Sequence, residues 1–293
     1  MSTSKELFTA KAATGIEGLD DILNGGLSRS HLFLLEGEPG TGKTTVALHF
    51  LQAGAKNGER SLYITLSETE RELRQGAASH GWDLDDNIHI FELTPPESLL
   101  NAEHQQSLLY SSDLELGEAT RQIFEAVERV KPTRVVLDSL SEIRLLAQSS
   151  LRYRRQILAI KHYFVRYEAT VLLLDDLTTE ALDKTVHSVA HGVIRLEELT
   201  PNYGAERRRV RVVKYRGQKY RGGFHDFTIM GDGVHVFLDQ RHKREGCPAR
   251  RRYRDRLQHA DPWPCRHGQI VDFDDFCCLG GGPRGKGRTV YLR

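Results

Sequence analysis

The chain has 293 residues, and 41 lysines and arginines nearly balance 40 aspartates and glutamates, which leaves a formal net charge of +1 at pH 7. This balance argues against a dominant polyanionic partner bound by charge alone. All four cysteines lie at Cys247 or beyond, so a disulfide framework for the main domain is excluded. No signal-peptide pattern occurs and no apolar run reaches the roughly 18 residues of a membrane span, so we expect a soluble, cytoplasmic protein without a membrane partner.

The first predicted elements are a buried strand over residues 32–35 and an amphipathic helix that begins near Val46, with a glycine-rich loop between them. The loop matches the complete phosphate-binding pattern G-x-x-x-x-G-K-[ST]; its residues are Gly37, Glu38, Pro39, Gly40, Thr41, Gly42, Lys43, Thr44 and Thr45. Glycines let backbone N–H groups close around a phosphate. We expect Lys43 to reach the β- and γ-phosphates of a bound nucleotide and Thr44 to hold Mg²⁺. The alternative is a glycine-rich turn that binds nothing.

Strand-like and helix-like runs then alternate, which predicts an α/β fold with a mostly parallel sheet between helices. The expected strands cover residues 61–66, 88–91, 134–138 and 170–174. The expected helices cover residues 70–80, 116–130 and 153–167. The segment 95–113 is polar and irregular, and we expect a surface loop there. Short segments over residues 193–196, 209–215, 224–229 and 234–237 are expected to extend the sheet as antiparallel edge strands.

Two carboxylates are placed to serve the phosphate loop. One apolar strand ends in Asp138, the natural second anchor for Mg²⁺ in a phosphate-loop protein. Glu68 follows an earlier strand, where it could orient a water molecule toward the γ-phosphate and act as a general base. The alternative for Glu68 is an acid at a helix N-terminus, beside a cap formed by Ser67 or Thr69.

Further short motifs surround these residues, and they lie at positions 14–20, 25–27, 79–84, 214–217 and 223–229. Taken in this order, they resemble the KaiC family of RecA-type phosphate-loop ATPases, which comprises the circadian clock ATPase and many bacterial relatives. The resemblance covers about residues 14–237 and corresponds to the first repeat of that family. It implies a RecA-like fold, ATP and Mg²⁺ as ligands, and ATPase activity.

The resemblance also implies a ring of six subunits that binds ATP at each interface. In the family a Lys-x-Arg pair of the neighbouring subunit reaches the γ-phosphate, and here the pair would be Lys214 and Arg216. An arginine supplied by a neighbour neutralises charge that develops during phosphoryl transfer. The alternative is that two alternate residues of a strand share a solvated face. We expect the ring to act as a nucleotide-dependent signalling switch with an unknown protein partner.

The chain departs from the clock protein at Ser67, where the clock protein has the first of two adjacent glutamates. Hydrolysis is therefore expected to be slow or to rely on Glu68 alone. Nothing in residues 14–237 matches the phosphorylated Ser/Thr site of the clock protein, which weakens the alternative of a serine/threonine autokinase. Two further alternatives are a RecA/RadA-like DNA-dependent ATPase, supported by the arginine-rich run 206–211, and a module that binds ATP without turnover.

From Leu238 the apolar periodicity ends and Arg, Gly, Pro and Cys accumulate, so we expect an ATPase domain over residues 1–237 and an atypical tail over 238–293. Back-translation of residues 250–271, read one nucleotide forward, permits a second phosphate loop. Our hypothesis is therefore a frameshifted remnant of a second repeat, without ordered structure. The alternative is a zinc site, which no C-x₂-C spacing supports; its ligands would come from Cys247, His259, Cys265, His267, Cys277 and Cys278.

Overall fold

The computed structural model describes residues 10–93, 108–177, 185–200 and 206–238, with the side chains of residues 108–115 excepted. All of these residues belong to the first of two units of the chain, Met1–Gln240. The predicted frameshift remnant, its zinc-ligand candidates and most of the loop predicted over 95–113 lie outside the described residues. In the part of the chain that the structure describes, no helix is long and apolar enough to cross a membrane.

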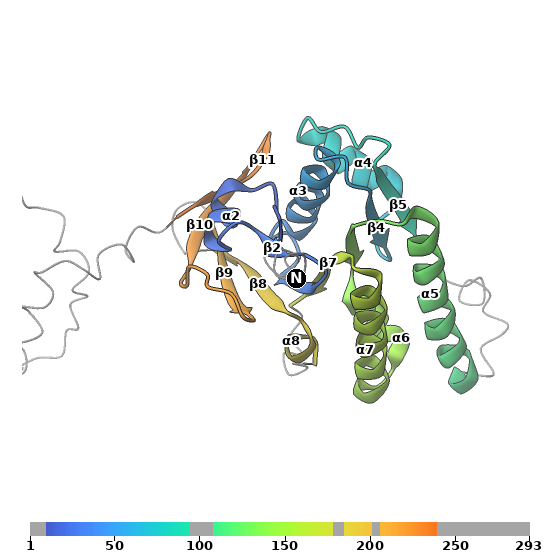
Figure 1. Ribbon diagram of the computed structural model, residues 1–293. Helices are drawn as coiled ribbons and strands as arrows, with labels where there is room; N and C mark the ends of the chain where they lie inside the picture. Colours follow the sequence, from blue (N-terminus) through green and yellow to red (C-terminus); the bar gives the residue numbers. More distant parts are fainter. Residues whose placement is uncertain (1–9, 94–107, 178–184, 201–205, 239–293) are drawn as a thin grey trace, which may run out of the picture. The chain divides into compact units, whose positions relative to one another are not determined.

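A sheet of nine strands forms the centre of this unit, in the order β11-β10-β9-β8-β3-β7-β6-β4-β5 (Figure 1). The strands are β3 (Leu32–Gly37), β4 (Ser61–Thr65), β5 (Ile88–Glu92), β6 (Arg134–Asp138), β7 (Thr170–Asp176), β8 (Gly192–Leu199), β9 (Arg207–Tyr215), β10 (His225–Met230) and β11 (Gly233–Phe237). Strands β3 to β8 pair in parallel, whereas β9, β10 and β11 pair antiparallel at one edge. A separate two-stranded sheet pairs β1 (Lys11–Ala12) with β2 (Leu27–Ser28). The predicted fold class, a mostly parallel sheet with antiparallel edge strands, is confirmed.

Helices cover both faces of the sheet (Figure 1). One face carries α2 (Glu17–Ile22), α3 (Lys43–Ala55) and α4 (Glu70–Ser79). The other carries α5 (Leu108–Val130), α6 (Leu140–Ala147), α7 (Ser150–Tyr167) and α8 (Thr185–Val189). This arrangement buries the central strands on both sides, as a parallel sheet requires.

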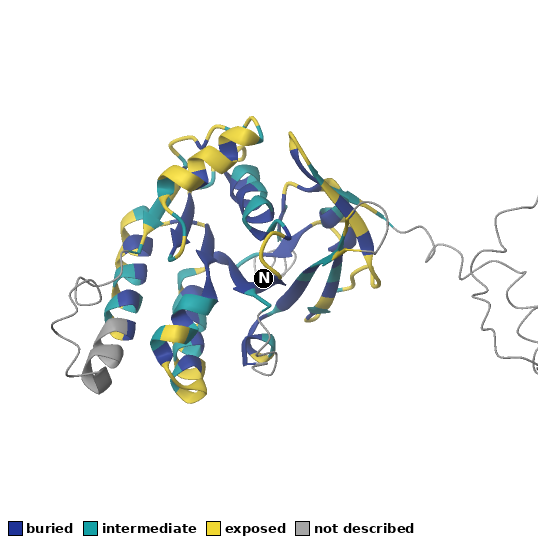
Figure 2. Cartoon of the chain, turned by 180° about the vertical axis from the view of Figure 1, so that it is seen from behind, coloured by how far each residue is buried: buried dark blue, intermediate teal, exposed yellow. Residues whose placement is uncertain are grey.

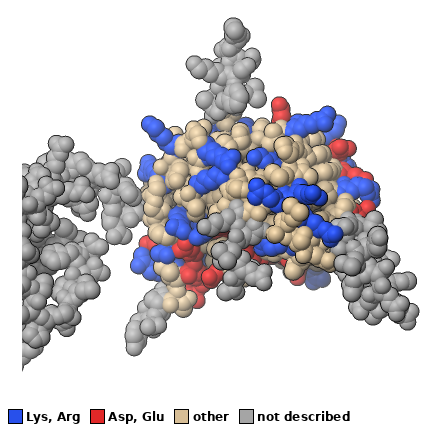
Figure 3. All heavy atoms as spheres, turned by 90° about the horizontal axis from the view of Figure 1, so that it is seen from below, with Lys and Arg blue, Asp and Glu red and all other residues tan. Residues whose placement is uncertain are grey.

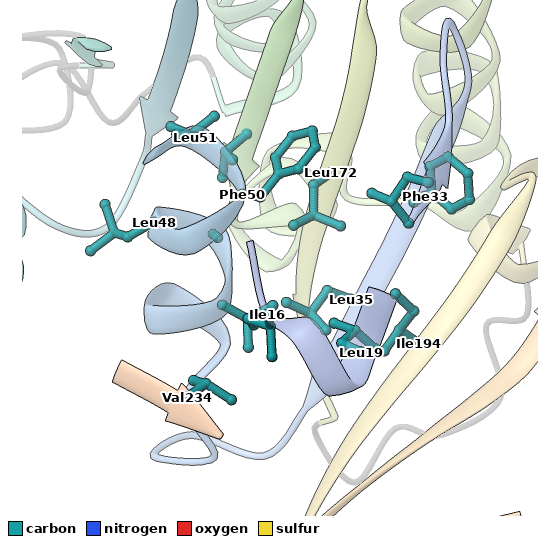
Figure 4. Close-up of a cluster of buried hydrophobic side chains, with 14 of the residues drawn as sticks. Ile16, Leu19, Phe33, Leu35, Leu48, Phe50, Leu51, Leu172, Ile194 and Val234 are labelled. Carbon is teal, nitrogen blue, oxygen red and sulfur yellow. The ribbon is translucent and has the colours of Figure 1, made fainter. Parts of the chain in front are cut away.

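Strand β3 shows how the sequence directs this packing, because its side chains alternate between the two cores. Phe33 and Leu35 pack with α3 on one face, whereas Leu32 and Leu34 join the core on the other. Figure 4 shows the first of these cores, where helix residues such as Phe50 meet side chains from β3, β7 and β8. Figure 2 shows that the central strands are buried along most of their length. A strand with both faces covered has a continuous run of apolar residues in its sequence, and this run is why these strands could be predicted.

The predicted strands and helices agree with the structure to within a few residues, apart from one segment. The loop predicted over 95–113 is wrong from Leu108 onward, because α5 begins there rather than near residue 116. Ser111, Ser112 and Asp113 have weak helix propensity, and such local preferences are readily overridden when a helix continues. The short elements β1, β2, α2, α6 and α8 were not predicted, because two to eight residues carry too little periodicity to detect.

A buried ion pair fixes the amino end of β6 beneath α3. The Arg134 side chain is only 1% exposed, and its Nε donates to Glu59 Oε2 at 2.8 Å. Its Nη1 donates to the carbonyl oxygens of both Ala13 and Phe50, at 2.6 and 2.8 Å. Burial alone would raise the pKa of Glu59, but hydrogen bonds and charge from Arg29 and Arg134 lower it to about 2. The pair is therefore held in its charged form.

We expect Glu59→Gln to lower the free energy of unfolding at pH 7 by about 3 kcal/mol, because Arg134 then stays buried without a counter-charge. The Glu59 contribution is present above the unfolded pKa of 4.5 and is lost as the pH falls toward the folded value of about 2. Urea unfolding across this pH range measures the effect, and the difference from the wild type should shrink with acidity. The exposed Glu128→Gln on α5 is the control, with a change below about 0.5 kcal/mol. Equal effects of both variants would contradict the expectation.

Candidate functional site

The phosphate-binding loop joins the carboxyl end of β3 to the amino end of α3. Gly42 forms the N-cap of α3 with φ of 95°, and Gly40 has φ of 84°. A Cβ on Gly37 would lie 2.6 Å from Thr41 Oγ1 and 2.9 Å from the Leu196 carbonyl oxygen. Glycine is required at these positions by backbone conformation or by close approach. The loop thus presents the first N–H groups of a helix, and such groups bind anions.

Lys43, the first residue of α3, lies folded back into the loop with a side chain only 9% exposed. Its Nζ donates to the carbonyl oxygens of Gly37 and Glu38 at 2.9 and 3.0 Å. The same Nζ forms an ion pair with Asp176 Oδ1 at 2.7 Å. The lysine predicted to bind phosphate is therefore in the loop, and its carboxylate partner is a residue that sequence reasoning did not identify.

Asp138 ends β6 directly beside the end of β4, where it pairs in register with Thr65. The Tyr63 hydroxyl donates a hydrogen bond to Asp138 Oδ2, and Thr44 is a second hydrogen-bonding neighbour of that hydroxyl. Burial raises the pKa of Asp138, whereas the Tyr63 hydrogen bond and the charge of Lys43 oppose that rise. Thr44 and Asp138 therefore meet at Tyr63, and their hydroxyl and carboxylate oxygens are ligands of the kind that Mg²⁺ prefers.

Glu68 lies in the turn between β4 and α4, and the side chain of Thr65 holds that turn. Thr65 Oγ1 donates to the Glu68 carbonyl oxygen at 2.7 Å and accepts from the Glu68 N–H at 2.9 Å. Thr69 caps α4, and Glu72 completes the capping box. Glu72, rather than Glu68, is therefore the acidic residue that caps the N-terminus of α4. Burial raises the pKa of the Glu68 carboxyl, and the charges of Asp138 and Glu72 add to the rise.

A cleft of about 430 Å³ adjoins the phosphate loop. It is lined by Thr44, Thr45, Leu48, Ser67, Glu68, Glu72, Leu73, Gly76, Ser79 and His80. These residues belong to α3, to α4, to the turn before α4 and, in the case of His80, to the C-cap of α4. The cleft therefore brings Thr44 and Thr45 of the predicted loop to the same space as Glu68, which is separated from them in the sequence.

The structure does not bring Lys214 and Arg216 to the phosphate loop of the same chain. Gly192, the first residue of β8, pairs with Phe33 near the start of β3 and with Tyr215 at the end of β9. The loop begins at Gly37, the opposite end of β3. Because each residue of a strand advances about 3.3 Å, Lys214 and Arg216 lie near the amino ends of the parallel strands, whereas the loop lies at their carboxyl ends.

Lys214 and Arg216 instead contact the carboxyl end of α8. Lys214 Nζ donates to the carbonyl oxygens of His187 and Ala190, and the Arg216 guanidinium donates to that of Ser188. Burial lowers the pKa of Lys214, and the nearby positive charges of Arg216 and Lys161 lower it further. The two side chains therefore contact the same end of one short helix.

The arginine-rich run in β9 is neutralised by carboxylates of neighbouring strands. Its ion pairs are Arg207–Asp226 at 2.8 Å, Arg208–Glu198 at 3.1 Å, Arg209–Glu197 at 2.7 Å and Arg211–Glu197 at 3.7 Å. Figure 3 shows a face of the molecule on which Lys and Arg side chains lie among neutral ones, with Asp and Glu near its margins. Arginines that are already paired contribute less to phosphate binding, so this arrangement argues against the DNA-dependent ATPase for which the run 206–211 was the support.

A buried cluster behind the loop was also missed by sequence reasoning. Glu36 precedes the loop, is 3% exposed, and bonds to Arg195 Nε and His187 Nε2 at 2.6 Å each. Burial would raise the pKa of Glu36, but its hydrogen bonds and charge interactions with these two residues lower it.

Of the other residues that sequence reasoning missed, Asp176 could have been found, because the strand over 170–176 ends in acids just as β6 ends in Asp138. For Tyr63 the sequence offered no signal beyond that of a core aromatic residue.

Comparisons with known proteins agree on one family. The family model described as "ATPase: KaiC" matches residues 12–241. A circadian clock oscillator protein KaiC of Parathermosynechococcus lividus is 30% identical over 233 residues, which are 78% of this chain and 42% of the relative. The chain thus spans less than half the length of this clock relative.

Shorter relatives match over nearly their whole length. A UPF0273 protein of Pyrococcus horikoshii is 28% identical over 244 residues, which are 81% of this chain and 98% of the relative. The crystal structure of a KaiC-like protein from the same archaeon superposes with a TM-score of 0.64 at 26% identity, covering 78% of this chain and 99% of that one. The matched region therefore corresponds to a protein with a single repeat.

Proposed function

The chain belongs to the KaiC ATPase family, and from that premise we propose that it hydrolyses Mg-ATP where two copies meet in a hexameric ring. The ring would serve as a nucleotide-dependent switch that a protein partner reads. The observation that carries this proposal is the position of Lys214 and Arg216, at the end of the sheet opposite the phosphate loop. A second copy must supply such a pair if it is to reach the phosphates.

The phosphate-loop half of the site lies within one chain. Residues Gly37 to Thr45 bind the phosphates through backbone N–H groups, and Lys43 adds a positive charge. Thr44 and Asp138 are the residues that would hold Mg²⁺, which when bound neutralises charge on the phosphates. The Tyr63 hydroxyl orients the Asp138 carboxylate by donating a hydrogen bond to its Oδ2.

Glu68 is proposed as the residue that orients the attacking water and accepts its proton. The turn that carries it is fixed by Thr65, and its carboxyl borders the same cleft as Thr44. A carboxyl with a raised pKa is a better proton acceptor than a fully solvated one. Because Ser67 offers no second carboxylate, we expect turnover to be slow, which suits a switch better than a motor.

Light scattering with Mg-ATP and without nucleotide tests the assembly. We expect a mass near six copies of the 33.2 kDa chain with Mg-ATP and a smaller species without it. Lys43→Met is the control, because it keeps the interface surfaces but weakens nucleotide binding, so the mass should no longer respond to Mg-ATP. A monomer in both conditions, at a concentration where Mg-ATP is bound, would overturn the interface site.

A further inference from the structure

Asp176 is the carboxylate partner of the phosphate-loop lysine. Its Oδ1 lies 2.7 Å from Lys43 Nζ, and the two side chains are 29% and 9% exposed. Asp138, the other acid near this lysine, accepts the hydrogen bond of Tyr63. Lys43 thus has two backbone carbonyl oxygens and one carboxylate around its ammonium group, and the carboxylate is the strongest of the three partners.

The position of Asp176 is set by the sheet rather than by a loose loop. It is the last residue of β7, and it pairs in register with Gly37, where the phosphate loop begins. The N–H of the next residue, Leu177, donates to the Gly37 carbonyl oxygen at 3.1 Å. The carboxylate is therefore held at the mouth of the loop, within reach of the same lysine that a phosphate would need.

The adjacent acid, Asp175, has a different role. It accepts from Arg144 at 2.7 Å and from Ser141 at 3.2 Å, and it is 8% exposed. Successive side chains of a strand point to opposite faces, so only one of the two acids meets Lys43. Two identical side chains thus stand next to each other in sequence, and one of them serves as a matched control for the other.

We propose that Asp176 competes with nucleotide phosphate for Lys43 and thereby sets the affinity for ATP and ADP. The inference rests on the proposed nucleotide site. A phosphate can bind Lys43 fully only after the lysine leaves Asp176, so the ion pair lowers the fraction of chains that are competent to bind. The freed carboxylate also remains close to the phosphate, and Mg²⁺ offsets that repulsion. Asp176 therefore weakens binding and makes it depend more steeply on Mg²⁺.

Titration of the fluorescent nucleotide mant-ADP tests this positioning role, with and without Mg²⁺. We expect Asp176→Asn to bind about tenfold more tightly than the wild type without Mg²⁺. The gain should be smaller with Mg²⁺, so the ratio of the two dissociation constants falls. Asp175→Asn removes the same charge one residue away but leaves the Lys43 pair intact, and its affinity should stay within about twofold of the wild type. An Asp176→Asn affinity equal to that of the wild type or of Asp175→Asn would overturn the proposal.

A double-mutant cycle shows whether Asp176 acts through Lys43. In a Lys43→Met background with Mg²⁺ present to offset direct repulsion, Asp176→Asn should change the mant-ADP affinity by less than about twofold, because no lysine remains to be released. Tightening that persists in this background would mean direct repulsion of the nucleotide, and would overturn the competition for Lys43. A wild-type protein that binds no mant-ADP would instead overturn the nucleotide site itself, and this inference with it.

Discussion

Replacement of Arg216 by alanine is expected to lower the rate of ATP hydrolysis by about 10³-fold, which is typical of the loss of an arginine that acts on a neighbour's phosphate. Nucleotide binding should change little, because the phosphate loop of each chain is intact. Phosphate release and mant-ADP titration measure the two quantities. Arg211→Ala is the matched control in β9, the strand that ends one residue before Arg216, because its guanidinium lies beside Glu197 and is remote from the proposed contact. A tenfold or smaller loss in Arg216→Ala would contradict the role in the neighbouring site.

Mixing two inactive variants tests the same role of Arg216, and activity that returns on mixing shows that neither variant was inactive because it misfolded. Glu68→Gln, which is expected to keep Mg-ATP binding and therefore assembly, lacks the base of the phosphate-loop half of the site, and Arg216→Ala lacks the half that a neighbour supplies. In a randomly mixed ring, about a quarter of the interfaces combine two intact halves, so activity should return to roughly that fraction. A mixture of Lys43→Met with Glu68→Gln should stay inactive, because both changes damage the same half. Activity that does not return in the first mixture would show that the two halves do not meet.

Glu68→Gln is expected to lower ATP hydrolysis by about 10²- to 10³-fold while Mg-ATP binding is retained, because an amide cannot accept the proton of the attacking water. Single-turnover hydrolysis and nucleotide titration separate the two effects. Glu70→Gln is the control, since Glu70 lies in the same region of the chain but pairs with Arg74 on the outer surface of α4. If Glu68→Gln leaves the rate of hydrolysis unchanged, Glu68 is not the base that accepts the proton of the attacking water. If the wild type itself shows no turnover, the chain is the binding module considered as an alternative.

The pH dependence of hydrolysis gives a second view of Glu68. Its pKa is raised above the ordinary 4.5 by burial and by the charges of Asp138 and Glu72. A general base works only when deprotonated, so activity should fall as the pH drops through the raised value, earlier than for an ordinary glutamate. The control is Glu72→Gln, which removes one of the charges that raise the pKa and should move the acidic limb to lower pH. An acidic limb that stays in place would exclude Glu68 as its source.

Much of the fold follows from local patterns in the sequence. The phosphate loop was predictable because its glycines, lysine and threonines are consecutive and lie between a buried strand and a helix. The position of Asp138 at the end of a strand was predictable because an apolar run precedes it, while its role toward Mg²⁺ stays a prediction. Asp176 ends another strand in the same way, yet its link to Lys43 depends on β7 lying beside β3, which no stretch of sequence reveals. The order of strands in the sheet is thus what separates the predicted part of the site from the missed part.

Side-chain partners were harder to predict than positions. Tyr63 lies in an apolar strand, where a tyrosine reads as core, and only the packed structure places its hydroxyl on Asp138. The placement of Lys214 and Arg216 far from their own loop also depends on the register of β8 with β3 and β9. Such facts come from tertiary contacts between residues distant in the chain, which sequence patterns do not specify.

His187 in α8 contacts both halves of the proposed site within one chain. Its ring bonds to Glu36, directly behind the chain's own phosphate loop, and its carbonyl oxygen accepts from Lys214, which is proposed to serve the next subunit. In a ring, a Lys214 that leaves His187 to meet a neighbour's ATP releases one end of a residue whose other end supports the local loop. In the proposed ring, occupancy of one pocket would thus be communicated to the next through His187, and we expect the six pockets to fill cooperatively rather than independently.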